Sequence, residues 1–302
     1  MINTADQRPP GDQAARLRQL VADRSPVDTG IGGPAGPKRG HAIAVVSGKG
    51  GVGKTNVAVN VAICLAARGL KVTLVDLDMG LANADLLLDA RSPYNISHVV
   101  SGLLPIDQVG VRTSGGIFFV PGASGVERLV DLPDFDRRHL VNQVAHLATG
   151  CDVLVMDCAA GISPNVLCFA ALADTCLLVT TPEPTAVADA YAFAKVSIGN
   201  SHQGLIRLLV NSTDSRDEAR EVFARISGVA ERFLNYAIAD AGYLLHDSHV
   251  ELAVRQRCPF VLRYPRCSAS ACMTAIANRI VGGRRADGRR GGLFRRVVGL
   301  FV

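Results

Sequence analysis

Six short apolar runs that lack polar alternation most constrain the fold of this 302-residue chain. Each has about five to seven residues, rich in valine, leucine and isoleucine, and they read HAIAVVS, LKVTLVD, GIFFVPG, CDVLVMD, TCLLVTT and IRLLVNS. Strands buried on both faces have this composition. Helical patterns such as NVAVNVAICLAARG separate most of the runs. The sequence therefore predicts an α/β fold with a doubly wound, mostly parallel sheet, helices on both faces, and ligands at the carboxyl ends of the strands.

The stretch GKGGVGKT at residues 48–55 follows the first apolar run and opens a helical pattern. It matches the phosphate-loop pattern G-x-x-x-x-G-K-[ST] between a strand and a helix. Its glycines let backbone N–H groups converge on phosphate oxygens, while Lys54 reaches the outer phosphates and the Thr55 hydroxyl reaches Mg²⁺. We expect the nucleotide to contact the whole loop, that is Gly48, Lys49, Gly50, Gly51, Val52, Gly53, Lys54, Thr55 and Asn56.

Carboxylates end two other apolar runs at the same edge of the predicted sheet. LKVTLVD ends in Asp76, with Asp78 two residues later, and CDVLVMD ends in Asp157. A magnesium-bound phosphate needs carboxylates that hold the metal or orient its waters. We therefore expect Asp76 and Asp157 in the metal shell, and Asp78, nearer the loop, orienting the attacking water. The alternative at each position is an aspartate that only caps a turn.

Lys49 is one lysine more than a phosphate loop needs, because Lys54 and the backbone amides already serve the phosphates within one subunit. Two interpretations stay open from the residues alone. Lys49 is either a solvated loop residue, or it reaches across a dimer to the partner's phosphates, as an arginine finger does when supplied in trans.

These stretches carry a resemblance. SGKGGVGKTNVAVNVA, LVDLDMGLANADLLL and LVMDCAAG are similar to the MinD/ParA group of deviant Walker A ATPases. The resemblance implies ATP and Mg²⁺ as cofactors, an ATP-dependent homodimer, slow hydrolysis, and a catalytic role for Lys49 across the dimer beside Asp78. It also implies that Asn211 contacts adenine. NSTD is like the guanine reader NKxD, but Ser212 stands where the lysine would cover the base, which favours adenine.

Other stretches resemble a narrower branch, the flagellar-number regulators called FlhG or FleN. These are VPGASG, DCAAGIS, TTPEPTAVADAYAFAK and FLNYAIADAGYLLHDSHVELAVRQRCPF, within residues 41–282. The resemblance implies a cytoplasmic ATPase, reversibly at the inner face of the cell membrane, that regulates flagellar number or placement. A flagellar switch protein or a transcription activator would be a further partner. Leu245 and His246 replace the usual Pro-Tyr, so a base contact from Asp247 stays open.

The first 24 residues predict a partner-binding helix, joined by a Gly/Pro-rich linker (25–40) to the ATPase domain (41–282). The segment DQAARLR fits the DQAxxLR element of the FlhG family, which implies docking on an FlhF-type GTPase and stimulation of its hydrolysis. The residues expected to bind this partner are Asp12, Gln13, Ala14, Leu17 and Arg18. The alternative is a frayed amphipathic helix that rests on its own domain.

The last segment, 283–302, predicts a basic linker and an amphipathic membrane-targeting helix. From residue 284 onward it holds six arginines and one aspartate, a balance of +5 that equals the formal charge of the whole chain. Apolar side chains share one face of the helix, and those expected at an anionic membrane are Leu293, Phe294, Val297, Val298, Leu300 and Phe301. Two tails on a dimer would strengthen the attachment. The alternative is a last helix packed on the body.

Composition and cysteine placement limit the other functions. The body before residue 284 is formally neutral, so no direct contact with nucleic acid is expected. A DNA-partitioning ParA-type ATPase or a division-site MinD-type ATPase remains an alternative. An electron-transfer protein of the nitrogenase iron-protein type would need cysteines that present a cluster, whereas Cys158 directly follows Asp157. The cysteines inside apolar segments are expected to be reduced and buried.

Overall fold

The computed structural model describes residues 39–80, 83–123, 132–200 and 204–283. The expected partner-binding helix and the expected membrane-targeting tail lie outside these residues. Within the described ranges, no helix combines the length and the apolar character needed to cross a membrane.

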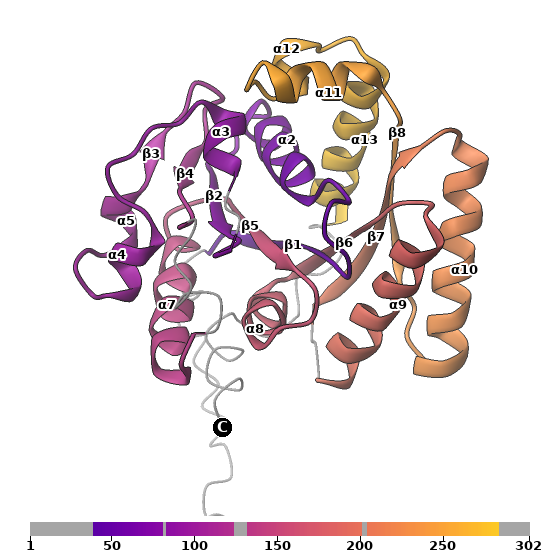
Figure 1. Ribbon diagram of the computed structural model, residues 1–302, viewed down its shortest axis with the longest axis horizontal. Coiled ribbons are helices and arrows are strands. Elements are labelled where there is room, and N and C mark those ends of the chain that lie inside the picture. The colour runs from indigo at the N-terminus through magenta and orange to yellow at the C-terminus, as the bar shows by residue number, and fades with distance from the viewer. Residues whose placement is uncertain (1–38, 81–82, 124–131, 201–203, 284–302) are drawn as a thin grey trace, which may run out of the picture. The chain divides into compact units, whose positions relative to one another are not determined.

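An eight-stranded sheet forms the centre of the fold, in the order β3-β4-β2-β5-β1-β6-β7-β8 (Figure 1). All neighbouring strands are parallel except β3 and β4, which are antiparallel. The strands are β1 (His41–Ser47), β2 (Val72–Leu77), β3 (Val111–Arg112), β4 (Phe118–Val120), β5 (Val153–Ala160), β6 (Thr175–Thr180), β7 (Leu205–Thr213) and β8 (Ala239–Leu245). The predicted doubly wound, mostly parallel sheet is confirmed.

Helices cover both faces of the sheet (Figure 1). One face carries α4 (Ile96–Val100), α5 (Ile106–Val109), α7 (Asp134–Leu147), α8 (Pro164–Leu172), α9 (Pro184–Gly199) and α10 (Arg216–Leu234). The other carries α2 (Lys54–Ala66), α3 (Ala84–Leu88), α11 (Ser248–Arg255), α12 (Phe260–Arg263) and α13 (Ser268–Gly283). The sheet therefore separates two hydrophobic cores.

Strand β1 shows why the apolar runs lack alternation. Ala42, Ala44 and Val46 pack into the core on one face, and Ile43 and Val45 pack into the core on the other. All five side chains have an exposed fraction of 0%. Each residue of a central parallel strand thus contributes to one of two cores, and a polar residue would have no solvated side to occupy.

Two strands were not among the six predicted runs. β8 (ADAGYLL) carries an aspartate and a glycine, and it lies at the edge of the sheet, where polar side chains reach solvent. Its pairing with β7 is irregular beside Gly242, which has a left-handed φ of 111°. β3 has only two residues, too few for any pattern to appear in the sequence.

Asp174, just before β6, anchors the beginning of the described body. Its carboxylate accepts two hydrogen bonds from the Arg39 guanidinium, at 3.1 and 2.9 Å, and a third from the Ala42 amide at 3.0 Å. Burial by itself would raise the pKa of Asp174, but the Arg39 contacts and the Ala42 amide outweigh it and hold the pKa below its ordinary value. The folded state therefore favours the charged carboxylate.

We expect Asp174→Asn to lower the free energy of unfolding at pH 7 by about 1–3 kcal/mol, because it removes a charge-assisted bidentate pair. A depressed folded-state pKa stabilises the fold above the ordinary aspartate pKa, and this contribution is lost as pH falls through the folded-state value. Denaturant titrations should thus show the difference between variant and wild type shrinking from pH 7 toward pH 3. Asp217→Asn is the control, because its side chain is 84% exposed. A difference that stays constant with pH would contradict the assignment.

Candidate nucleotide-binding site

The phosphate loop connects the end of β1 at Ser47 to the start of α2 at Lys54. Gly51 and Gly53 have φ values of 80° and 89°, in the left-handed region that glycine adopts without strain. The Ser47 hydroxyl donates a 2.8 Å hydrogen bond to the carbonyl of Lys49 and fixes the first turn of the loop. The loop therefore has the strand–loop–helix setting that the sequence predicts.

Two loop positions require glycine because other parts of the chain lie too close to admit a Cβ atom. A Cβ on Gly48 would lie 2.1 Å from the backbone carbonyl oxygen of Asp189 in α9. A Cβ on Gly53 would lie 2.4 Å from the side-chain nitrogen of Asn211, which donates a 2.7 Å hydrogen bond to the Val52 carbonyl. Asn211 thus holds the loop itself, and its predicted contact with adenine stays a prediction. By contrast, the space beside Gly50 and Gly51 is open for at least 4 Å in the described structure, as a phosphate cradle requires.

The pair Gly48→Ala and Gly50→Ala tests this difference. We expect Gly48→Ala to lower the free energy of unfolding by about 1–3 kcal/mol, because backbone on both sides must shift to admit the methyl group. Gly50→Ala should leave it within about 0.5 kcal/mol, because its Cβ enters open space. Denaturant unfolding without nucleotide measures both variants. Equal stabilities for the two variants would contradict the close approach.

Asp76 and Asp157 lie side by side on the neighbouring strands β2 and β5, where they are register partners. Both are buried, with exposed fractions of 1% and 0%. The sequence predicted that this strand ends at Asp157, but β5 continues through the small residues that follow, to Ala160. The two carboxylates therefore lie next to each other, buried near the carboxyl ends of β2 and β5.

The surroundings of these two carboxylates differ. Asp76 accepts hydrogen bonds from the amides of Asp78 (3.0 Å) and Ala84 (3.3 Å), so it also caps the loop after β2. Burial and the charge of Asp157 raise the pKa of Asp76 well above its ordinary value. Burial raises the pKa of Asp157 to about 6, although the Lys54 ammonium and the nearby Thr55 hydroxyl lower it. Neither carboxylate oxygen of Asp157 accepts a hydrogen bond of normal geometry from the described residues.

A buried carboxylate whose oxygens accept no hydrogen bond of normal geometry from the described residues is suited to bind a cation or the waters around one. Mg²⁺ is usually held by one or two carboxylates together with waters and nucleotide phosphates. Thr55, Asp76 and Asp157 supply such a donor set, and Lys54, 8% exposed, supplies the cation for the outer phosphates. Bound Mg²⁺ would neutralise phosphate charge during transfer to water. The open cradle and the unpartnered Asp157 thus fit a magnesium nucleotide, as the sequence predicts.

Asp78 follows β2 and borders a cavity of about 170 Å³. Ser163 and Asn165, in the segment after β5, also line this cavity. One Asp78 carboxylate oxygen accepts a hydrogen bond from the Gly80 amide at 3.2 Å. This location beside the loop and the buried carboxylates is compatible with the predicted orientation of water, which stays a prediction.

Lys49 is bound within its own chain. Its ammonium lies 2.6 Å from the Glu183 carboxylate and 2.7 Å from the Thr185 hydroxyl, at the start of α9. Thr185 donates to the same Glu183 oxygen at 2.7 Å. Glu183 and Thr185 lie in the stretch TTPEPTAVADAYAFAK, for which the sequence predicted no role in the nucleotide site. To reach a partner's phosphates, the ammonium must first leave Glu183.

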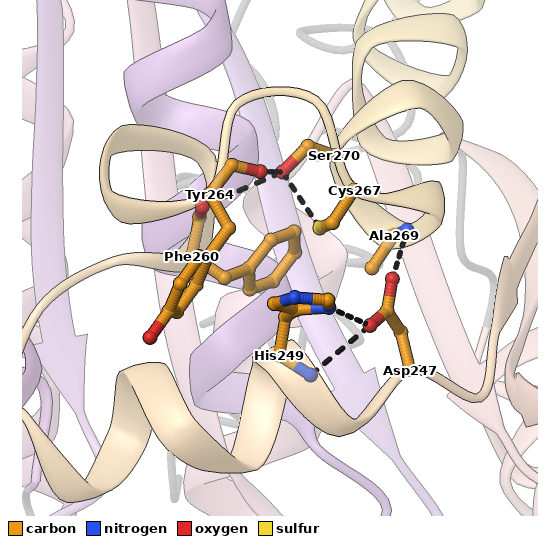
Figure 2. A network of polar contacts seen from close by, with 7 residues as sticks. All are labelled: Asp247, His249, Phe260, Tyr264, Cys267, Ala269 and Ser270. Carbon is orange, nitrogen blue, oxygen red and sulfur yellow. Dashed lines mark hydrogen bonds and ion pairs between the residues drawn. The ribbon is translucent and has the colours of Figure 1, made fainter.

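Asp247 is engaged in a polar network between α11 and α13 (Figure 2). One oxygen accepts from the backbone amide of His249 at 3.0 Å and contacts the His249 ring nitrogen at 2.8 Å, while the other accepts from the Ala269 amide at 3.2 Å. Burial alone would raise the pKa of Asp247, but these hydrogen bonds lower it to about 2. Asp247 therefore serves as the N-cap of α11 and ties that helix to α13.

Of the five cysteines inside apolar segments, three are buried as predicted, whereas Cys64 and Cys151 are only partly buried. All eight are free thiols, and Cys158, Cys168 and Cys176 are buried. Burial raises the pKa of Cys176 to about 12, so this thiol stays protonated. Cys158 has an exposed fraction of 0% inside the core, which is not a position from which a thiolate could present a cluster at a subunit surface. The structure thus disfavours the electron-transfer alternative.

A phosphate loop between β1 and α2, with buried carboxylates at the same sheet edge, defines a P-loop nucleotide-binding protein. A family model described as "ParA: NUBPL iron-transfer P-loop NTPase" matches residues 38–281. The chain therefore belongs to the ParA/MinD family of P-loop ATPases, and its cofactors are ATP and Mg²⁺. In the described residues, no group of three or more His, Cys, Asp and Glu side chains could hold a metal ion such as iron.

Similar proteins agree with this assignment. The chain is 38% identical to the antiactivator FleN of Pseudomonas aeruginosa, over 79% of this chain and 85% of that protein. It is 33% identical to the flagellum site-determining protein YlxH of Helicobacter pylori, over 67% of each chain. The crystal structure of the cell division ATPase MinD of Pyrococcus furiosus aligns with a TM-score of 0.69 and 23% identity, over 80% of this chain and 99% of that one. This last likeness shows the fold.

Proposed function

We propose that this protein is an ATP-driven switch that regulates the number or placement of flagella. The observation that carries the proposal is the 38% identity to the antiactivator FleN over 238 residues. The 33% identity to the flagellum site-determining protein YlxH supports the same role. The word antiactivator agrees with a flagellar transcription activator as a further partner, and a flagellar switch protein is the other candidate.

ATP would act by pairing two subunits. Lys49 lies on the phosphate loop, and its ammonium binds the Glu183 carboxylate at the start of α9. Lys54, in contrast, is buried and remains available for the phosphates of its own subunit. In the proposed switch, Lys49 leaves Glu183 and completes the partner's phosphate site. Hydrolysis, with water oriented by Asp78, then removes the group that Lys49 contacts and separates the subunits.

Two further contacts would connect the switch to its surroundings. The N-terminal element around Gln13 would dock on an FlhF-type GTPase and stimulate it, and the C-terminal tail would attach the dimer to an anionic membrane. The protein would then move between the cytoplasm and the inner face of the membrane as dimers form and separate. GTP hydrolysis by that GTPase, measured with full-length protein and with Gln13→Ala, tests the first contact. Equal stimulation by the two proteins would exclude it.

A division-site function is the second candidate, because MinD of Bacillus subtilis is 36% identical, although over only 50% of this chain. Deleting the gene from the source organism separates the two functions. We expect an altered number of flagella per cell, counted by electron microscopy, and restoration by the wild-type gene. Normal flagella together with misplaced division septa would overturn the flagellar proposal in favour of the second candidate. ParA-type partitioning of DNA predicts neither change and would show as plasmid or chromosome loss.

A further inference from the structure

Helices α11 and α12 form a surface that combines exposed aliphatic side chains with arginines. Both helices lie on the α2 face of the sheet (Figure 1). Leu252, Val254 and Leu262 keep 42%, 39% and 45% of their area exposed. Leu252 and Val254 belong to α11 and Leu262 belongs to α12, so both helices of this stretch expose aliphatic side chains and the stretch is a candidate binding surface. We call this stretch, from Ser248 to Ser268, the α11–α12 surface.

The α11–α12 surface is strongly basic. Its four arginines, Arg255, Arg257, Arg263 and Arg266, are exposed, and none forms an ion pair with a carboxylate of the described residues. Glu251 is its single acidic residue, so the stretch carries 4 − 1 = +3. Since residues 1–283 are formally neutral, the rest of them carries −3. The exposed aliphatic side chains therefore lie in a stretch with a net positive charge, whereas the rest of residues 1–283 has a net negative charge.

The polar network of Figure 2 holds this surface in a fixed shape. The His249 ring packs on the Tyr264 ring at 4.8 Å between centroids, which joins α11 to the end of α12. The Ser270 hydroxyl donates to the Tyr264 carbonyl at 2.7 Å, and the Arg263 side chain donates to Gln256 at 2.8 Å. A surface that is already ordered loses little conformational entropy on binding.

Arg257 lies in the turn that ends α11. Its backbone φ is 50°, in the left-handed region, where a residue with a Cβ costs about 1 kcal/mol. Glycine would adopt this turn without strain, yet an exposed arginine occupies it. The Arg257 amide donates to the Val254 carbonyl at 3.0 Å and the Cys258 amide donates to the Ala253 carbonyl at 3.1 Å, so this left-handed residue closes the end of α11 and leaves its guanidinium exposed.

The α11–α12 surface is also joined to the helix that begins at the phosphate loop. Asn60 of α2 is fully buried, and its side-chain oxygen accepts a 3.1 Å hydrogen bond from the Val261 amide in α12. The Asn60 nitrogen donates to the Asn56 carbonyl at 2.8 Å, in the first turn of α2. A partner bound here would thus rest on α12, which is hydrogen-bonded to the helix that begins at the phosphate loop.

We propose that the α11–α12 surface binds an acidic protein segment that carries leucine or phenylalanine side chains. Guanidinium groups match carboxylates in a planar, two-bond geometry, so unpaired arginines beside aliphatic side chains fit such a segment. A membrane fits less well, because interfacial anchors insert fully exposed aromatic or long aliphatic side chains, whereas these three are half-buried. This inference goes beyond the flagellar role and does not depend on it.

Fluorescence anisotropy on the full-length protein tests the proposal. The probe is a labelled peptide of about 16 residues that combines Glu and Asp with Leu and Phe, and a second peptide has Gln and Asn in place of the acids. The test variant is Arg257→Glu/Arg266→Glu, whose side chains have no hydrogen bond in the described structure. The matched control is Arg216→Glu/Arg225→Glu on α10. Vesicles of phosphatidylglycerol and phosphatidylcholine form a separate arm.

We expect the acidic peptide to bind the wild type and the control, and to bind the test variant about tenfold or more weakly. Added salt should weaken this binding, and the neutral peptide should bind about tenfold or more weakly than the acidic one. Equal binding of the two peptides, or of the test variant and the control, would overturn the proposal. Vesicle binding that the test variant alone loses, without peptide binding, would assign the surface to a membrane instead. ATP hydrolysis at the wild-type rate shows that both variants are folded.

Discussion

Asp157→Asn is expected to lower kcat for ATP hydrolysis about 100-fold or more, while the protein still binds nucleotide through its phosphate loop. The reason is the position of this carboxylate. It is fully buried beside Asp76, its oxygens accept no hydrogen bond of normal geometry from the described residues, and Lys54 and Thr55 lie nearby. The asparagine keeps the shape of the side chain but loses the charge that orients the waters of Mg²⁺.

Phosphate release under saturating ATP and Mg²⁺ measures the effect. Asp107→Asn is a matched control, because Asp107 is exposed in α5 and should leave kcat unchanged. A thermal melt within a few degrees of the wild type would show that the asparagine variant is folded. Hydrolysis at more than about a third of the wild-type rate would contradict a role for Asp157 in the metal shell.

Lys49→Ala is expected to abolish ATP-dependent dimerisation and to change nucleotide affinity of the monomer much less. Within one chain, the Lys49 ammonium contacts Glu183 and Thr185, whereas Lys54 and the loop amides remain available for the phosphates. Removing Lys49 should therefore mainly affect the partner's site. A lost cation at a transferring phosphate corresponds to about 10³-fold or more in rate in other phosphate-loop enzymes, so hydrolysis should fall as well.

Size-exclusion chromatography with light scattering, in a non-hydrolysable ATP analogue and Mg²⁺, measures this dimerisation. Lys71→Ala serves as the control, since Lys71 is an exposed lysine just before β2, at the opposite end of that strand from Asp76. A Lys49→Ala protein that still dimerises with the analogue would exclude the contact across subunits. A wild-type protein that stays monomeric under the same conditions would exclude the pairing altogether.

Local sequence was sufficient for the features that depend on neighbouring residues. The apolar run of β1 reveals a strand buried on both faces, and the loop glycines with Lys54 and Thr55 reveal a phosphate site. In both cases the structural requirement acts on residues close together in the chain. The doubly wound sheet followed from the repetition of such runs.

Contacts that depend on strand order could be predicted only in part, because the sequence placed Asp76 and Asp157 at one sheet edge without showing that their strands are neighbours. Asp76 and Asp157 become neighbours only because β5 lies between β2 and β1. The contact between Lys49 and Glu183 likewise joins residues 134 positions apart. The hydrogen bonds of Asp247 to His249 and Ala269, which make it a helix cap, were likewise not predicted, and its contact with the base stays open. Such roles emerge only from tertiary packing, which a linear pattern does not contain.

The tight seat of Gly48 against α9 has a mechanical consequence. Because no free space separates that glycine from the Asp189 carbonyl, a change in the conformation of the loop at Gly48 would displace α9. Glu183 and Thr185 border the first turn of the same helix. A change in the loop when the bound nucleotide changes would therefore displace α9, and a molecule that contacts only the outer side of α9 would respond to that displacement.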